Sequence, residues 1–261
     1  MHAAMLAAGV GRRLEDASLP PKVLLAFGGE SLLARHAAIL RACGVRRLDL
    51  VVGYRAELIE AEIERIGARD LIRTIYNPDF EAGSVVSFAR LDDSLRAGES
   101  VLFMDGDVLY DRRLLERLIA APRDDCFLMD RQTGEGEDPV RLCLRDGLLV
   151  DFHKRPEEPH DWSGEWIGFA RFGSETAARI ADAAAAIVEN GRSDAIYEEA
   201  IRDVLLAEPP GRFGVLDVTG LPWIEIDFPE DLERARKEIF PRVSAADAES
   251  EEPGAAGRTA S

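Results

Sequence analysis

The sequence predicts a three-layer α/β domain built on a mixed, mainly parallel sheet. Short apolar runs alternate with amphipathic segments through the first half of the chain, and glycine or charged turns separate them. The 261 residues are 46% hydrophobic, which is enough for a sizeable core. Strands that alternate with helices favour a doubly wound sheet with helices on both faces.

The elements of the first half follow in order from this alternation. Apolar runs predict strands at 2–8, 48–52, 72–76, 101–104 and 126–130. Apolar residues at helical spacing predict helices at 31–43, 55–66, 84–96 and 111–120. Gly44 directly after the first of these helices is a suitable C-terminal cap.

The pattern changes after residue 130. Asp146-Gly147 between two apolar runs predicts a hairpin. Further strands are expected at 165–172, 213–218 and 223–227, and helices at 174–190, 194–207 and 229–240. We therefore expect one domain over residues 1–240, a small β-rich lid inserted at 134–172, and a disordered tail over 244–261, where large apolar residues are almost absent.

The charge balance excludes two classes of partner. The chain has 49 acidic and 32 basic residues, a formal net charge of −17. This argues against nucleic-acid binding, which needs clustered cations, and against an anionic membrane surface. No apolar run is long enough to insert into a membrane. Three cysteines without a CxxC pair indicate a reducing compartment, so we expect a cytoplasmic protein.

A glycine-containing loop and a rare lysine are the first candidate site. Gly9 and Gly11 follow the first strand, where backbone N–H groups can hold phosphate oxygens. Lys22, one of only three lysines, follows two stiffening prolines. The alternatives are an ordinary turn and a solvated lysine. Dinucleotide binding is disfavoured, because Leu14 stands where the third glycine of that motif belongs.

Two pairs of carboxylates are the second candidate site. Asp105 and Asp107 flank a glycine directly after a buried strand, and the carboxyl ends of parallel strands are where such sheets bind ligands. Glu225 and Asp227 share one face of a later strand. Carboxylates suit Mg²⁺, which takes one or two of them together with phosphate oxygens. The alternatives are a tight Asp-Gly turn and an acidic helix start.

The N-terminal motifs resemble a known family. LAAGVGRRL followed by PPKVLLAFGGESLL is similar to the signature of nucleotidyltransferases that activate phosphorylated sugars and alcohols. The resemblance implies a Rossmann-like, GT-A-like nucleotidyltransferase fold, with Asp107 and Asp227 as ligands of Mg²⁺. It also implies catalytic roles for Lys22 and Arg12. The implied nucleotide-binding residues are Leu6, Ala7, Ala8, Gly9, Gly11, Arg12, Arg13, Lys22, Gly83, Ser84, Ser87 and Asp105.

Segments in the middle of the chain resemble the phosphocholine cytidylyltransferases of this family. NPDF followed by GSVVSF places Ser87 near the base by resemblance, and Ser84 is a candidate helix cap. The stretches HK, GEWIG and YEEAI are also similar. The implied acceptor-binding residues are Lys154, Glu165, Trp166, Tyr197, Glu198 and Glu225, with Trp162 beside them. Aromatic faces and negative charge suit a cationic head group, although either Trp166 or Tyr197 alone could equally be a core residue.

The resemblance implies transfer of CMP from CTP to a small phosphorylated alcohol or amino-alcohol, with release of pyrophosphate. The alternatives are a sugar-1-phosphate or inositol-phosphate nucleotidyltransferase, a molybdopterin-type nucleotidyltransferase, and a non-catalytic nucleotide-binding regulatory module. The YEEAI and WIEID segments count against the molybdopterin type. The expected partners are CTP and the acceptor, and a homodimer stays open.

Overall fold

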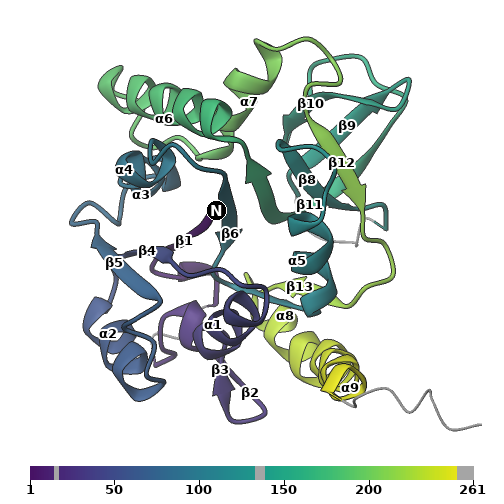
Figure 1. Ribbon diagram of the computed structural model, residues 1–261. Helices are drawn as coiled ribbons and strands as arrows, with labels where there is room; N and C mark the ends of the chain where they lie inside the picture. The colour runs from purple at the N-terminus through teal and green to yellow at the C-terminus, as the bar shows by residue number, and fades with distance from the viewer. Residues whose placement is uncertain (15–17, 133–138, 252–261) are drawn as a thin grey trace, which may run out of the picture.

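The alternating segments form one mixed sheet in a computed structural model that describes residues 1–14, 18–132 and 139–251. The strand order is β10-β9-β11-β6-β1-β4-β5, and β8 joins through β11 and carries β12 (Figure 1). The strands are β1 (His2–Ala7), β4 (Leu48–Val52), β5 (Ile72–Tyr76), β6 (Val101–Asp105), β8 (Cys126–Asp130), β9 (Arg141–Arg145), β10 (Leu148–His153), β11 (Trp162–Phe172) and β12 (Gly214–Asp217).

The four strands β5, β4, β1 and β6 run parallel, and β11 is antiparallel to β6. Leu6 of β1 pairs with Val51 on one side and with Asp105 on the other. The loop after β1 and the turn after β6 therefore leave the sheet at the same edge. This register brings the two sequence motifs, far apart in the chain, to one place.

Helices cover both faces of the sheet, as the apolar spacing predicted. One face carries α3 (Ser84–Ala89), α4 (Asp92–Leu95), α6 (Ser174–Glu189) and α7 (Glu198–Leu206) (Figure 1). The other face carries α1 (Leu32–Ala42), α2 (Ala56–Arg65) and α5 (Arg112–Ile119). Each face encloses its own apolar core, so the three-layer arrangement is confirmed.

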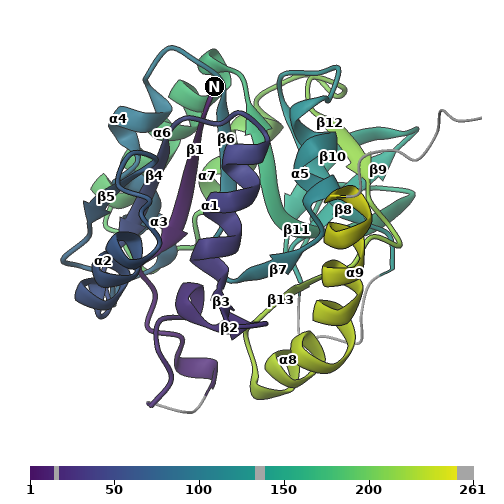
Figure 2. The same ribbon diagram turned by 60° about the horizontal axis from the view of Figure 1, so that its bottom comes forward.

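The C-terminal segment corrects the expected disordered tail. Helix α8 (Pro229–Arg234) continues through a π-helical turn at 235–239 into α9 (Phe240–Glu251), beside the β2–β3 hairpin (Figure 2). Val243 is fully buried in a third core, and Arg35 donates a 2.9 Å hydrogen bond to Asp247. These two contacts stabilise a helix in a segment whose composition alone predicted disorder. Residues 252–261 lie outside the described chain.

The expected lid is part of the main sheet. Strands β9 and β10 form the predicted hairpin, with Asp146 at φ 51° and Gly147 at φ 74° in its turn. Strand β11 pairs first with β9 and then with β6 and β8, so the hairpin extends the central sheet. The first residues of the predicted lid, 134–138, lie outside the described chain.

Several short elements differ from the prediction. The expected helix at 84–96 is the two helices α3 and α4, and the helix expected from 194 begins at Glu198. The sequence did not indicate β2 (Ala26–Phe27), β3 (Glu30–Ser31) or β7 (Val108–Tyr110), which pairs with β13 (Trp223–Glu225). Within the described chain, no helix combines the length and hydrophobicity needed to cross a bilayer.

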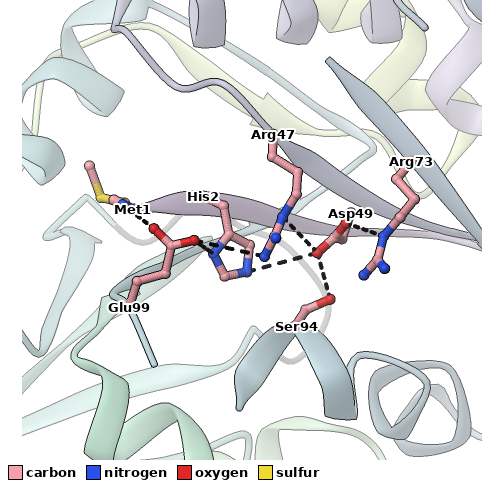
Figure 3. Close-up of polar contacts among 7 residues, drawn as sticks. All are labelled: Met1, His2, Arg47, Asp49, Arg73, Ser94 and Glu99. Carbon is pink, nitrogen blue, oxygen red and sulfur yellow. Dashed lines mark hydrogen bonds and ion pairs between the residues drawn. The ribbon is translucent and has the colours of Figure 1, made fainter. Parts of the chain in front are cut away.

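A buried polar cluster closes the opposite edge of the sheet, at the amino ends of the parallel strands. The fully buried carboxylate of Asp49 accepts hydrogen bonds of 2.7 Å from Arg73 and from Ser94 (Figure 3). The Arg47 guanidinium lies 3.4 Å from the same carboxylate, and the His2 ring lies 3.9 Å from it. A buried carboxylate satisfied in this way ties β1, β4, β5 and α4 together.

Candidate active site

Two clefts open at the carboxyl edge of the parallel strands. The smaller has a volume of about 270 Å³ and is lined among others by the predicted residues Leu6, Ala7, Ala8, Gly9, Gly11, Lys22, Ser84, Ser87 and Asp105. The larger has a volume of about 450 Å³ and is lined among others by Lys154, Glu165, Trp166, Glu198 and Glu225. Asp105, Glu198 and Glu225 line both clefts, so the clefts meet at an acidic wall.

The glycine loop shapes the floor of the smaller cleft. Gly11 has a φ of 67°, a left-handed conformation that favours glycine, and a Cβ there would lie 3.4 Å from the Lys22 side chain. Arg13, one residue beyond Arg12, donates a 2.7 Å hydrogen bond to Asp227. The Arg12 side chain is largely exposed, lies 3.7 Å from Glu81 and lines neither cleft. The structure therefore brings Arg13, but not the predicted catalytic Arg12, to the carboxylates.

Lys22 joins the two predicted carboxylate pairs. It begins the short 3-10 turn Lys22–Leu24 directly after Pro21, and its Nζ donates a 3.0 Å hydrogen bond to Asp107 and another to Asp227. Burial opposes the charged form of Lys22, but the charges of Asp107 and Asp227 outweigh it and raise the lysine pKa. Despite burial, the charges of Lys22 and Arg13 also lower the pKa of Asp227.

Asp107, Glu225 and Asp227 can converge on one ion. One carboxylate oxygen from each lies within 4.8 Å of the others. Three hard oxygen donors beside the smaller cleft fit a divalent cation such as Mg²⁺. Desolvation by the surrounding protein, together with the charges of Asp107 and Asp227, raises the pKa of Glu225 to about 8. The carboxylate of Asp231 accepts hydrogen bonds from the Asp227 N–H (3.1 Å) and the following N–H, so helix α8 orients Asp227.

A buried histidine supports the Asp105-Gly106-Asp107 turn. His36 of α1 is fully buried, and its Nε2 lies 3.1 Å from the Gly106 carbonyl oxygen. Because a carbonyl only accepts, this nitrogen carries the proton. Burial lowers the pKa of His36 to about 4, so the ring is neutral at pH 7. The sequence did not indicate this role, because a single histidine on an apolar helix face belongs to no recognisable motif.

Asp105 is held from two sides. The Tyr197 hydroxyl donates a 2.7 Å hydrogen bond to it, and burial together with the Asp107 charge raises its pKa well above the usual value. Gly168 of β11 has a φ of 83°, and a Cβ there would lie 2.7 Å from an Asp105 oxygen. Strand β11 therefore needs glycine at this position to pass the acidic wall.

The segment 83–87 forms one wall of the smaller cleft and corrects a prediction. Gly83, not Ser84, is the N-terminal cap of α3, and the Ser84 hydroxyl instead accepts a 3.0 Å hydrogen bond from the Tyr197 N–H. The Gly83 N–H donates to the Ser193 carbonyl at 2.7 Å. Ser87 accepts a 2.9 Å hydrogen bond from the Asn77 amide. Gly83 itself does not line the cleft, so its role is to let this segment contact residues 193–195.

The aromatic residues predicted for the acceptor are mainly core residues. The Tyr197 ring stacks on Phe88 at 5.4 Å and 5°, and Tyr197 lines the smaller cleft. Trp166 is 5% exposed and packs edge-on against Phe152 at 4.9 Å. Both were open to this interpretation from the sequence, and each is only 5% exposed.

The structure adds residues that the sequence patterns did not indicate. Trp223 and Asp130 line the larger cleft, and the Trp223 Nε1 donates a 2.8 Å hydrogen bond to Asp130. Asp231 was visible only as an acid in a helix start. The preference of helix N-termini for acids is enough to explain an acid at this position. Its hydrogen bonds to the backbone of Asp227 and Phe228 could therefore not be inferred from the sequence.

Comparisons with known proteins agree with this arrangement. The model of the MobA-like NTP transferase domain matches residues 3–162. The chain is 28% identical over 244 residues to the CMP-5'-(3-aminopropyl)phosphonate synthase of Streptomyces rubellomurinus, covering 90% of this chain and 38% of that protein. It spans 38% to 52% of the length of three curated relatives that it matches.

Two solved structures share the fold. The inositol-1-phosphate CTP transferase of T. maritima has a TM-score of 0.72 at 21% identity, over 97% of both chains. The CTP:phosphocholine cytidylyltransferase of Streptococcus pneumoniae has a TM-score of 0.70 at 18% identity, over 90% of this chain and 97% of that one. They support the Rossmann-like nucleotidyltransferase fold expected from the N-terminal motifs. The family match covers more than half of the residues, and the chain belongs to the MobA-like NTP transferase domain family.

Proposed function

We propose that this protein transfers CMP from CTP to a small phosphate- or phosphonate-bearing acceptor and releases pyrophosphate. The observation that carries the proposal is the position of Lys22. Its ammonium contacts both Asp107 and Asp227 where a nucleotide-sized cleft meets a second cleft. The cytidylyl group in particular is supported by the named activities of the relative from Streptomyces rubellomurinus and of the two solved structures.

The chain's residues would act by positioning and charge. The backbone of the Gly9–Gly11 loop, Lys22 and Arg13 would bind the triphosphate. An acceptor oxygen attacks the α-phosphorus, and the bond from that phosphorus to the bridging β-oxygen breaks in line, with pyrophosphate carrying away the electron pair. The attacking group is already an anion, so no strong general base is needed. Asp107, Glu225 and Asp227 would hold Mg²⁺, which would neutralise charge on the reacting phosphates.

A second candidate acceptor is a polyol phosphate such as an inositol or sugar phosphate. The larger cleft offers the carboxylates of Asp130, Glu165 and Glu198, and carboxylates accept hydrogen bonds from hydroxyl groups well. A non-catalytic nucleotide-binding module is less consistent with a lysine held directly between two potential metal ligands.

The proposal is tested by pyrophosphate release over a grid of nucleotides and acceptors. The grid crosses CTP, UTP, GTP and ATP with aminoalkyl phosphates, aminoalkyl phosphonates, phosphocholine, inositol 1-phosphate and glucose 1-phosphate, each with Mg²⁺. We expect turnover with CTP and at least one of these acceptors, and none in Asp227→Asn. Absence of turnover across the whole grid would contradict an active cytidylyltransferase.

A further inference from the structure

The acceptor cleft is too acidic for a simple anion. Its lining contains seven carboxylates, Asp105, Asp130, Glu165, Glu198, Glu225, Asp227 and Asp231, against four cations, Arg13, Lys154, Arg234 and Arg242. Two of the carboxylates, Glu225 and Asp227, belong to the expected metal set, where a divalent cation would neutralise them. The remaining carboxylates would repel a dianionic phosphate compound that carries no positive charge of its own.

Glu198 is the carboxylate whose contacts are least complete. It is nine-tenths buried, begins helix α7 and lines both clefts. Its Oε2 atom has no hydrogen-bond partner among the described residues. A buried carboxylate oxygen without a donor costs free energy until a donor reaches it. The described salt bridges include none from Glu198, and burial raises its pKa to about 7, although the charge of Lys154 opposes this shift.

The described aromatic rings in and near the larger cleft do not form an aromatic cage for a quaternary ammonium. Such a cage needs several open ring faces around the cation. Tyr197 and Trp166 use their faces in the core, and the guanidinium of Arg131 lies 4.4 Å over the ring of Trp162. The Phe228 ring, which lines the same cleft, has the Arg13 guanidinium 5.7 Å away. This leaves Trp223 as a single aromatic wall among the described lining residues.

We infer that the acceptor is a zwitterion with a primary ammonium group, and that Glu198 binds this group. A primary ammonium brings three N–H donors to a carboxylate, whereas a trimethylammonium brings none. The inference rests on the proposed cytidylyl transfer and adds the chemical class of the acceptor. Glu198 thereby determines which group the acceptor can carry in addition to its reacting phosphate.

The test compares three acceptors of equal chain length: 2-aminoethyl phosphate, its N-trimethyl derivative and 2-hydroxyethyl phosphate. We expect the highest kcat/KM for the primary amine in the wild-type protein. In Glu198→Gln, kcat/KM for the amine should fall about 30-fold, whereas the hydroxyl compound should change by less than about threefold. Glu199→Gln is the matched control, because Glu199 lies in the same helical turn and pairs with Arg192 instead.

The outcomes separate this inference from the proposed function. Equal or better turnover of the trimethyl or hydroxyl compound by the wild-type protein overturns the inference and leaves cytidylyl transfer standing. An equal loss for all three acceptors in Glu198→Gln also overturns it. No turnover with any acceptor, including inositol 1-phosphate, overturns both. If the Glu198 variant fails to fold, the order of the three acceptors in the wild-type protein still decides.

Discussion

At the scale of single residues, Lys22 is the most informative side chain. Its contacts with Asp107 and Asp227 place an ammonium where a divalent cation would bind. The sequence predicted that these three residues belong to one site, because the motifs that contain them occur in a recognisable order. That Lys22 lies between the two aspartates was not predictable, since it depends on how a 3-10 turn and two strand ends meet.

Replacing Lys22 with methionine should change two measurements in opposite directions. Turnover should fall about 100- to 1,000-fold, because a cation aimed at the reacting phosphates is lost. Binding of Mn²⁺ without nucleotide, followed by electron paramagnetic resonance, should become about tenfold tighter, because the competing ammonium is gone. Unchanged or weaker Mn²⁺ binding would show that Lys22 does not occupy the cation position.

At the scale of elements, apolar runs defined β1, β4, β6 and β8 correctly, because a strand inside the sheet is buried and needs mostly apolar residues. Strand β5 was also predicted correctly, although it lies at the edge of the sheet and is only partly buried. The two-residue strands β2 and β3 were not predictable, since pairing between the strands defines them. The break between α3 and α4 also escaped prediction, because apolar spacing continues across Arg90 and Leu91. Tertiary contacts decide such details.

The burial of His36 in α1 should make the protein sensitive to acid, because burial disfavours the charged form of the ring. The pKa of His36 is lowered to about 4 in the folded protein from 6.5, so the unfolded chain takes up a proton first as the pH falls. This contribution to stability is fully present above pH 6.5 and decreases down to about pH 4, by about 3 kcal/mol in total.

Urea unfolding at several pH values measures this effect. His36→Gln keeps an N–H donor for the Gly106 carbonyl but cannot titrate, so its free energy of unfolding should decline less over this pH range. His36→Ala is the control that loses the hydrogen bond at every pH. The same pH dependence in wild type and His36→Gln would exclude His36 as the cause.

The close packing of α3 against the segment before α7 depends on Gly83. A Cβ at Gly83 would lie 2.5 Å from the carbonyl carbon of Asp194 and closer still to the Ala195 oxygen. Gly83→Ala should therefore destabilise the fold by about 1–3 kcal/mol and raise the KM for CTP. Gly173 has the same backbone conformation at the cap of α6 but a nearest contact of 3.3 Å, so Gly173→Ala is the matched control. Thermal unfolding and initial rates measure the two effects. Equal changes in both variants would contradict the steric explanation.

At the scale of the whole molecule, the three layers followed from the alternation of strands and helices, and the shared edge followed from placing both motifs at the carboxyl ends of parallel strands. The C-terminal helix did not, because the buried Val243 and the ion pair between Arg35 and Asp247 hold a segment whose composition predicts disorder. The structure locates part of the net charge of −17, because several of the acidic residues line the two clefts. Strong negative charge there requires cationic partners, either a divalent ion or an ammonium group.

The central claim is that the meeting point of the two clefts joins CMP to a phosphate- or phosphonate-bearing acceptor. Mass spectrometry of the wild-type reaction with CTP, Mg²⁺ and the acceptor panel tests it most directly. We predict one CMP–acceptor conjugate formed for each pyrophosphate released, and no conjugate from Asp227→Asn that remains folded. Release of pyrophosphate with free CMP as the only nucleotide product in every reaction would contradict the claim.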